Sequence, residues 1–389
     1  MKILFAVENY YPKVSGVPNV TKYLCEGLVI RGDDVAVVTC KHDLTLSEEI
    51  LNGVHIYRFN LLITLLKGYS GDIKSYVEFV KSYHPDVLIL VCSQCVTTDI
   101  LLPHLYELSC TKVFYSHGFS GLKLKPFSMK DTFIHTIGNT YNYFRLKRYY
   151  KSFNNYLTYV DYAICLSSAD SGKLLLEKYT KVHIIGNAVD KSFFTLNKNS
   201  NVNSLLKYTQ LTNDDYLLSV ANYSSIKNQK LLLKEFYLSN RLDVAMVFIG
   251  STVNSYYDSL LKYNKICEKQ YGKREVHFLY NVDRSDIPDI VGKAKLYLVG
   301  SDVEEFSISL IEAMAMGTPF ISTDVGNAKI LPGGIVCLGS DIHVVINKLL
   351  DSRLDMERLC RMGMDYARTN CQQQIAIDKL YNLVHTTNL

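Results

Sequence analysis

Short apolar runs alternate with longer mixed segments along this 389-residue chain, and this alternation limits its possible folds more than any other feature. Short runs rich in Val, Ile and Leu are typical of strands that are buried on both faces. In the first half of the chain they occupy residues 2–8, 34–40, 86–92, 112–116, 162–167 and 182–186. The segment 18–31 between the first two runs has helical spacing. Repeated strand–helix–strand units of this kind predict a parallel, doubly wound sheet.

The same alternation starts again after a polar stretch at 196–215, which is rich in Asn, Ser and Thr. Six further apolar runs occupy residues 216–222, 244–250, 276–280, 295–301, 319–323 and 334–339. Segments with helical spacing lie between them at 228–239, 255–271 and 307–316. The length suits two domains, and we place the linker near the polar stretch, which carries little that could pack. The sequence therefore predicts an α/β protein with two Rossmann-like, doubly wound domains that face each other across a ligand-binding cleft.

Composition disfavours several classes of protein. The formal net charge of +4 does not by itself predict a nucleic-acid partner. No stretch of about 18 apolar residues occurs, so we expect no membrane-spanning helix and a cytoplasmic location. The ten cysteines are scattered, and Cys92 and Cys95 form the only C-x-x-C pair. That pair has no second pair or nearby His at zinc spacing, which favours the end of a buried strand over a metal or redox site.

Two glutamates flank the predicted start of one helix. The strand at 295–301 leads into a helix that we expect to begin at Ser307, with its hydroxyl as the N-cap acceptor, and to end at Gly317. Glu304 precedes this start and Glu312 lies inside the helix, with seven residues between them. Free amides and the positive end of the dipole make a helix N-terminus an anion site. With a diphosphate bound there, one carboxylate can meet a sugar and the other a ribose, although the spacing alone equally fits two unrelated acids.

The segment EEFSISLIEAMAMGTP, at 304–319, resembles the E-x7-E motif of the family 4 retaining glycosyltransferases, which have the GT-B fold. Further segments match the family in order and spacing over nearly the whole chain, at 10–39, 115–121, 164–175, 183–194 and 218–236. The resemblance implies an acceptor-side domain at 1–195 and a nucleotide-sugar donor domain at 196–369. It also implies that a C-terminal helix at about 370–389 packs back on the first domain.

The resemblance implies a retaining hexosyltransferase that moves a sugar from a nucleotide-diphosphate donor to a hydroxyl acceptor, in cell-surface polysaccharide or glycolipid biosynthesis. It assigns sugar binding near the reaction centre to Glu304 and stabilisation of the leaving diphosphate to Lys227. It also places His117 against the donor sugar, although a lone strand-end His is more often structural. No Asp-x-Asp motif occurs in the chain, so we expect neither a metal nor another cofactor.

The resemblance also implies a set of donor-binding residues. Glu312 takes the ribose 2′ and 3′ hydroxyls, and Asn222 stands where the family usually has an Arg, which leaves Lys227 as the cation for the diphosphate. Asn187, at the junction of the domains, is a further candidate that equally fits a turn. The donor-binding residues so assigned are Gly16, Asn222, Lys227, Phe306, Ser307, Ile308, Ser309 and Glu312.

The acceptor side carries a basic, aromatic segment. Seven Lys or Arg residues and one Asp lie between Leu122 and Lys151, interleaved with Phe and Tyr. This pattern suits peripheral contact with an anionic membrane or a lipid-linked glycan acceptor, and it equally fits a helix with one buried aromatic face. Two other functions stay open: a nucleotide-sugar epimerase of the same fold, and a catalytically silent glycosyltransferase-like subunit, which Asn222 in place of the usual Arg keeps open.

Overall fold

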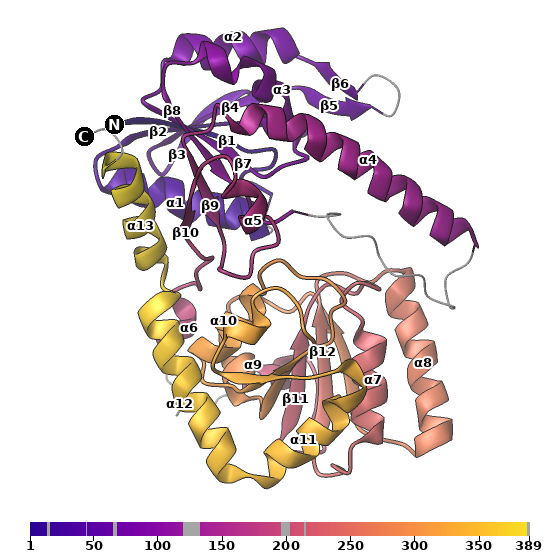
Figure 1. The fold of residues 1–389 in the computed structure, drawn as a ribbon. Coiled ribbons are helices and arrows are strands. Elements are labelled where there is room, and N and C mark those ends of the chain that lie inside the picture. Colours follow the sequence, from indigo (N-terminus) through magenta and orange to yellow (C-terminus); the bar gives the residue numbers. More distant parts are fainter. Residues whose placement is uncertain are drawn as a thin grey trace. The chain divides into compact units, whose positions relative to one another are not determined.

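The computed structural model describes residues 1–13, 16–43, 45–64, 68–119, 133–195, 203–213 and 215–386, with the backbone alone for residues 133–139. The chain forms two compact units, drawn in Figure 1. Met1–Gly186 and Gln374–Leu389 make up the first, and Asn187–Gln373 make up the second. Each unit is built on its own sheet.

The sheet of the first unit has eight strands in the order β10-β9-β8-β7-β1-β2-β4-β3, and β3 runs antiparallel to β4. A separate hairpin joins β5 to β6. The strands expected from the sequence do not include β3 to β6. In β4, buried residues alternate with half-buried ones, so this strand forms no continuous apolar run. The strands are β1 (Lys2–Ala6), β2 (Asp34–Cys40), β3 (Glu48–Leu51), β4 (Val54–Phe59), β5 (Leu61–Thr64), β6 (Gly68–Gly71), β7 (Val87–Val91), β8 (Thr111–Tyr115), β9 (Tyr162–Cys165) and β10 (Lys181–Ile184).

The C-terminal helix α13 packs against α1 within this unit. A Cβ added to Gly27 in α1 would lie 2.5 Å from Cδ1 of Ile377, so the glycine allows the two helices to approach closely. Arg31 pairs with Asp378 beside this contact. The helices of the unit are α1 (Gly16–Ile30), α2 (Ile73–Tyr83), α3 (Val96–Leu101), η1 (Leu102–Glu107), α4 (Phe133–Leu157), α5 (Lys173–Leu176) and α13 (Gln373–Thr386).

The sheet of the second unit is parallel, in the order β13-β12-β11-β14-β15-β16. Its strands coincide with the six apolar runs expected from the sequence. The strand order reverses between β11 and β14, which are neighbours in the sheet although they are distant in sequence. In open parallel sheets, ligands bind beside such a reversal, at the carboxyl ends of the strands. The strands are β11 (Tyr216–Val220), β12 (Ala245–Gly250), β13 (Val276–Tyr280), β14 (Leu296–Val299), β15 (Phe320–Ser322) and β16 (Gly334–Val336).

Helices cover both faces of this second sheet, over two hydrophobic clusters. Leu218 and Tyr297 contribute to one cluster, and their chain neighbours Leu217 and Leu296 contribute to the other, because successive side chains of a strand point to opposite faces. The helices are α6 (Ser192–Thr195), η2 (Ser204–Lys207), α7 (Gln229–Leu238), α8 (Ser255–Tyr271), α9 (Ile287–Lys293), α10 (Ile308–Ala315), η3 (Ala328–Ile330), η4 (Gly339–Asp341), α11 (Ile342–Asp351) and α12 (Arg353–Asn370).

The boundary between the two units lies between Gly186 and Asn187, which is earlier in the chain than the expected boundary between residues 195 and 196. Val189 and Phe193 pack into the core of the second unit, which draws the residues before 196 into it. The polar stretch at 196–215 was expected to carry little that could pack. Leu205, which lies in it, is nevertheless fully buried in the core of the second unit.

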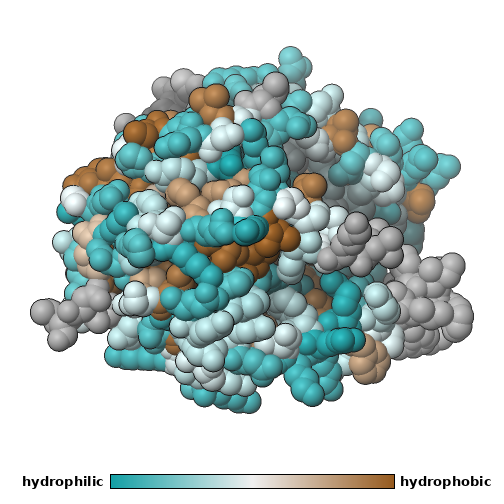
Figure 2. All heavy atoms as spheres, turned by 90° about the horizontal axis from the view of Figure 1, so that it is seen from above, coloured by the Kyte–Doolittle hydropathy of each residue, from teal (hydrophilic) through white to brown (hydrophobic). Residues whose placement is uncertain are grey.

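Within the part of the chain that the structure describes, no helix is both long enough and apolar enough to cross a membrane. Figure 2 shows one face of the surface, on which hydrophobic side chains form separate patches among hydrophilic ones. Several large apolar side chains are exposed, including those of Leu62, Ile63 and Phe144 in the first unit.

Candidate active site

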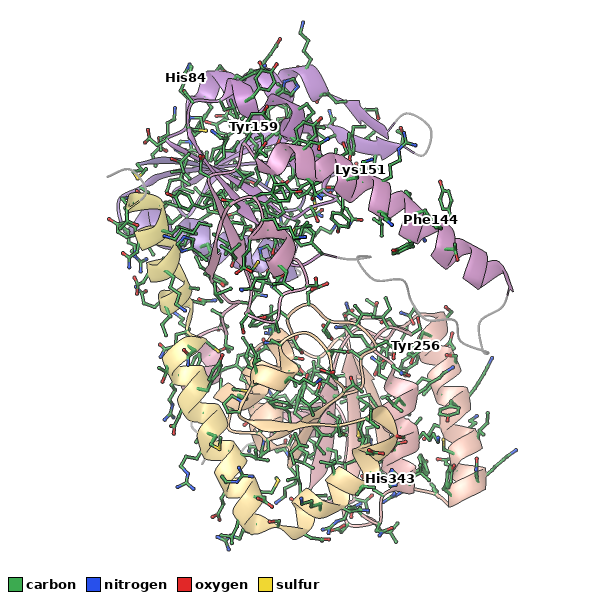
Figure 3. All side chains as sticks on the ribbon, viewed as in Figure 1. His84, Phe144, Lys151, Tyr159, Tyr256 and His343 are labelled. Carbon is green, nitrogen blue, oxygen red and sulfur yellow. The ribbon has the colours of Figure 1, made fainter. Side chains whose placement is uncertain are left out.

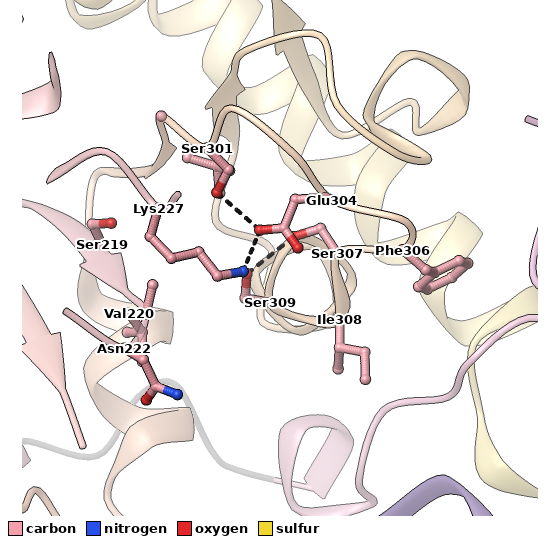
Figure 4. A pocket seen from close by; sticks show the side chains of 13 residues that line it. Ser219, Val220, Asn222, Lys227, Ser301, Glu304, Phe306, Ser307, Ile308 and Ser309 are labelled. Carbon is pink, nitrogen blue, oxygen red and sulfur yellow. Dashed lines mark hydrogen bonds and ion pairs between the residues drawn. The ribbon is translucent and has the colours of Figure 1, made fainter. Parts of the chain in front are cut away.

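A cavity of about 280 Å³ lies at the carboxyl ends of β11 and β14, where the strand order of the second sheet reverses (Figure 4). Its walls come from these strand ends, the turn before α7, and the loop between β14 and α10. The residues that line it are Ser219, Val220, Ala221, Asn222, Lys227, Val299, Gly300, Ser301, Glu304, Phe306, Ser307, Ile308 and Ser309. The structure thus brings together most of the donor-binding residues expected from the sequence.

Lys227 and Glu304 form an ion pair in this cavity. The ammonium Nζ of Lys227 lies 2.5 Å from Oε1 of Glu304, which also accepts a hydrogen bond from the hydroxyl of Ser301 at 2.9 Å. The side chains are 31% and 13% exposed, so solvent screens the pair only in part. Among the described residues that line the cavity, Lys227 is the only cation and Glu304 the only carboxylate. Each therefore offers one charge to a ligand once the pair separates.

The helix start at α10 differs in detail from the expected N-cap. Ser307 occupies the N-cap position with an extended backbone, but its side chain accepts no capping hydrogen bond and instead lies 3.2 Å from the hydroxyl of Ser309. The amide of Ser307 donates to Oδ1 of Asn327 at 2.9 Å, so this amide already has an acceptor. Ile308 and Ser309 line the cavity, and first-turn amides have no acceptor inside their helix. The helix ends as expected before Gly317, whose φ is 64°.

Two residues that are not among the candidates expected from the sequence, Gly326 and Asn327, fix the loop before α10. The side chain of Asn327 is completely buried, and its Oδ1 fixes the amide of Ser307. Gly326 has φ of 51°, and a Cβ there would lie 2.9 Å from the carbonyl oxygen of Glu305. No local sequence signal marks these residues, because their partners lie about 20 positions earlier in the chain.

Asn222 lines the cavity without adding charge. Its Oδ1 accepts a hydrogen bond from the hydroxyl of Ser251 at 2.8 Å, and its carbonyl oxygen accepts from the side chain of Gln229 at 3.0 Å. These bonds tie the end of β11 to β12 and α7. In the strand next to it, the hydroxyl of Tyr297 donates to the carbonyl oxygen of Val220 at 3.0 Å and so fixes the strand end that enters the cavity.

Glu312 is buried in α10 and is absent from the residues that line the cavity. Its carboxylate pairs with Arg284, in the loop between β13 and α9. Burial raises the pKa of Glu312, the charge of Arg284 lowers it, and the charge of Asp190 adds to the rise. Arg284 is not among the site residues expected from the sequence.

The remaining candidates are not among the residues that line this cavity. His117 and Gly16 belong to the first unit, and Asn187 is the first residue of the second. His117 follows β8 with φ of 47°, its ring stacks on that of Tyr115, and burial lowers its pKa to about 3. Its Nε2 is buried without a hydrogen-bond partner among the described residues. Gly16 begins α1 in open space, and Oδ1 of Asn187 is buried and, within the described chain, unpaired.

The described residues contain no group of three His, Cys, Asp or Glu side chains placed to hold a metal ion. Cys92 and Cys95 are both free thiols at the end of β7. A hydrogen bond between them, together with burial, raises the pKa of Cys95, so this thiol stays protonated at neutral pH.

Two family profiles match the sequence. The profile described as Glycosyltransferase Family 4 matches residues 14–193, and the profile described as Glycosyl transferases group 1 matches residues 204–331. A search of curated proteins found no match.

Solved structures resemble the whole chain. Sucrose-phosphate synthase from Thermosynechococcus elongatus matches with a TM-score of 0.75 at 15% identity, over 99% of this chain and 98% of that one. Anabaena HepE in complex with UDP and glucose matches with a TM-score of 0.70 at 15% identity, over 99% of this chain and 100% of that one. WaaG, a glycosyltransferase involved in lipopolysaccharide biosynthesis, matches with a TM-score of 0.68 at 14% identity, over 98% of this chain and 99% of that one. At these identities the likeness shows the fold.

Proposed function

Because the chain belongs to the family 4 glycosyltransferases and has the GT-B fold, we propose that it transfers a sugar from a nucleotide-diphosphate donor to a hydroxyl acceptor, with retention of configuration. The observation that carries this proposal is the cavity at β11 and β14, where one ammonium, one carboxylate and a helix N-terminus meet. A nucleotide-sugar has the matching groups, an anionic diphosphate beside a ring of hydroxyls.

In this proposal the donor separates the Lys227–Glu304 pair. Lys227 and the amides of Ile308 and Ser309 bind the diphosphate, and the carboxylate of Glu304 accepts hydrogen bonds from the sugar hydroxyls. Asn222 contributes no charge, so Lys227 and the helix N-terminus carry the electrostatic stabilisation. Gly16, in open space at the start of α1, leaves room for the phosphates to approach, and Asn187 stays a candidate without an assigned contact.

The reaction breaks the bond between the anomeric carbon and the diphosphate oxygen, and the diphosphate leaves with the electron pair. The acceptor hydroxyl forms the new bond on the same face, and its proton passes to the leaving phosphate oxygen. Negative charge grows on the diphosphate as the bond loosens, and Lys227 stabilises it. The imidazole of His117 is neutral, so it serves as a hydrogen-bonding group for the sugar and not as a cation.

UDP-sugars are the first donors to test, because two of the similar structures contain UDP compounds. HepE was solved with UDP and glucose, and the structure described as trehalose-6-phosphate from E. coli has UDP-2-fluoro glucose bound. Thermal shift with UDP-, GDP- and ADP-sugars identifies the donor, since a bound ligand raises apparent stability. Product analysis by NMR then tests retention. We propose that transfer needs no metal, so activity should survive EDTA.

The same assay separates the alternatives. Release of nucleoside diphosphate with a sugar inverted at C2 indicates an epimerase, and donor binding without turnover indicates a silent subunit. Retained configuration in a transferred hexose supports the proposal, and an inverted product contradicts it.

We further propose a lipid-linked glycan acceptor, used at the cytoplasmic face of a membrane. Helix α4 contains Arg145, Lys147, Arg148 and Lys151 but no Asp or Glu, and all four side chains are exposed. No ion pair joins them to another described residue. Figure 3 shows Lys151 and Phe144 standing on this helix, and Phe144 is 61% exposed. Exposed cations beside an exposed aromatic ring favour an anionic lipid surface. Residues 122–132, which carry the other cations of this segment, lie outside the described residues.

A further inference from the structure

Arg284 and Glu312 join a surface charge to a buried one. Nη2 of Arg284 donates to Oε1 of Glu312. The Glu312 side chain is 8% exposed and that of Arg284 is 63% exposed. The guanidinium carbon of Arg284 lies 5.2 Å from the ring centroid of Phe193, a residue of α6. The guanidinium group therefore packs over this ring. Among the described residues, no other cation pairs with Glu312.

The surroundings of this carboxylate give Arg284 a specific task. Burial disfavours the ionised form of Glu312, and the carboxylate of Asp190 repels it. The buried phenol of Tyr297 also interacts with it and offers no positive charge. Arg284 is thus the group that stabilises the ionised form. This matters for recognition, because an ionised carboxylate accepts hydrogen bonds from hydroxyls with both oxygens, whereas a protonated one does not.

The pair is one-sided. Only Oε1 of Glu312 bonds to Arg284, and no hydrogen bond reaches Oε2 from the described part of the chain. A guanidinium bonded to one oxygen holds that oxygen in place and leaves the second oxygen for a ligand.

We propose that Arg284 is a positioning residue for the donor, one that fixes Oε1 of Glu312 so that Oε2 accepts the 2′ hydroxyl of the ribose. This inference rests on the proposed function and on the ribose role that the resemblance to the family implies for Glu312. It adds a second cation to the donor side of the protein, one that acts on the acid and not on the diphosphate.

The test compares nucleotides that differ by one hydroxyl. Isothermal calorimetry at pH 8 and pH 6 measures UDP, GDP, ADP and their 2′-deoxy forms against wild type, Arg284→Met, Arg284→Gln and Arg284→Lys. Arg353→Met is the matched control, because Arg353 forms an exposed ion pair with Glu357 in α12. Wild type should bind one ribonucleotide about tenfold more tightly than its deoxy form, the contribution of a hydrogen bond to a charged group.

In Arg284→Met that preference should fall to about twofold or less. It should fall further at pH 6, because a carboxylate without its cation takes up a proton at higher pH. Arg284→Lys should restore most of the preference, and Arg353→Met should leave it unchanged. Arg284→Gln keeps a hydrogen-bonding N–H group but removes the positive charge. It replaces Arg284→Met in the comparison if the methionine variant does not fold.

Unchanged preference and unchanged pH dependence in the uncharged variants would overturn the inference. Tighter ribonucleotide binding in them would also overturn it, since Arg284 would then compete with the ribose. If wild type binds none of the three ribonucleotides, the proposed function fails instead. A wild type that binds a ribonucleotide and its deoxy form equally overturns the role of Glu312, and the positioning role with it.

Discussion

The ammonium of Lys227 lies 2.5 Å from Oε1 of Glu304, although the two residues are 77 positions apart in the chain. The two side chains come from different loops at the carboxyl edge of one sheet, the turn before α7 and the loop before α10. In the protein without donor each charge neutralises the other, so neither is left unpaired in a partly buried cavity. In the proposed function, the diphosphate and the sugar hydroxyls of the donor replace both halves of this pair.

Replacing Glu304 by Gln should abolish transfer while leaving folding nearly unchanged. The amide keeps the shape of the carboxyl group but loses its charge, and we expect transfer to fall at least about 100-fold. The free energy of unfolding should change by about 1 kcal/mol or less, because the lost ion pair is only partly buried. Steady-state assays and urea unfolding measure the two quantities. Glu357→Gln, in an exposed pair of α12, is the control that should change neither. Wild-type turnover in Glu304→Gln would rule out its role.

Lys227→Ala should weaken nucleoside diphosphate binding far more than nucleoside binding. A lost charge-assisted contact costs about 1.5–3 kcal/mol, which is a loss of roughly 10- to 100-fold in affinity. Calorimetry with UDP and with uridine measures the loss of affinity for the nucleotide and for the nucleoside separately. Lys295→Ala removes a more exposed ammonium, paired with Asp215 near the amino end of β14, and should change neither affinity. Equal losses for nucleotide and nucleoside would show that Lys227 does not contact the phosphates.

Because of His117, the free energy of unfolding should decrease as the pH falls below 6.5. Its pKa in the folded protein is about 3, below the ordinary value of 6.5, because burial disfavours the imidazolium. Above pH 6.5 the ring is neutral in both states. As the pH falls from 6.5 toward 3, the unfolded chain binds a proton that the folded protein does not, so the free energy of unfolding falls.

Urea unfolding of wild type and His117→Gln at pH 7.5 and pH 5 isolates this effect. The difference between the two proteins should shift by about 1–2 kcal/mol in favour of the variant at pH 5. A difference that stays constant between the two pH values would mean that the imidazole takes up its proton freely in the folded state.

Gly326→Ala should disturb the loop that carries Glu304. The residue has φ of 51°, and the added Cβ would lie 2.9 Å from the carbonyl oxygen of Glu305. We expect a cost of about 1–3 kcal/mol in stability together with weaker donor binding. Gly272→Ala is the control, since its φ of 88° is also positive but nothing lies within 4 Å of the added atom. It should lose stability and keep donor affinity, and equal donor affinity in both variants would contradict the role given to Gly326.

Reversing the charges of Lys147, Arg148 and Lys151 to Glu should abolish binding to vesicles that contain anionic lipid. Each cation near such a surface contributes about 1 kcal/mol, so the triple change removes at least about 3 kcal/mol of attraction. Sedimentation with phosphatidylglycerol vesicles measures the loss, and donor affinity should be unaffected. The same charge change at Lys262, Lys265 and Lys269 on α8 is the control. If both triple variants still sediment with the vesicles, α4 is not the contact surface.

The sequence by itself determined the elements that form continuous apolar runs or have marked helix boundaries. The six apolar runs of the second unit are its six strands, and the E-x7-E segment lies at a helix start, because continuous apolar runs and helix boundaries leave local signals. The same signals missed β4, whose side chains alternate between buried and half-buried.

Only the tertiary structure decided the pairings around the site. The amide of Ser307 bonds to Asn327, Glu312 pairs with Arg284, and Lys227 pairs with Glu304. Each pair joins residues from separate loops or helices. The pairing of Lys227 with Glu304 depends on β11 and β14 lying side by side in the sheet. Periodicity reports whether a residue is buried and not which polar group it meets there, because partners are set by contacts between distant segments.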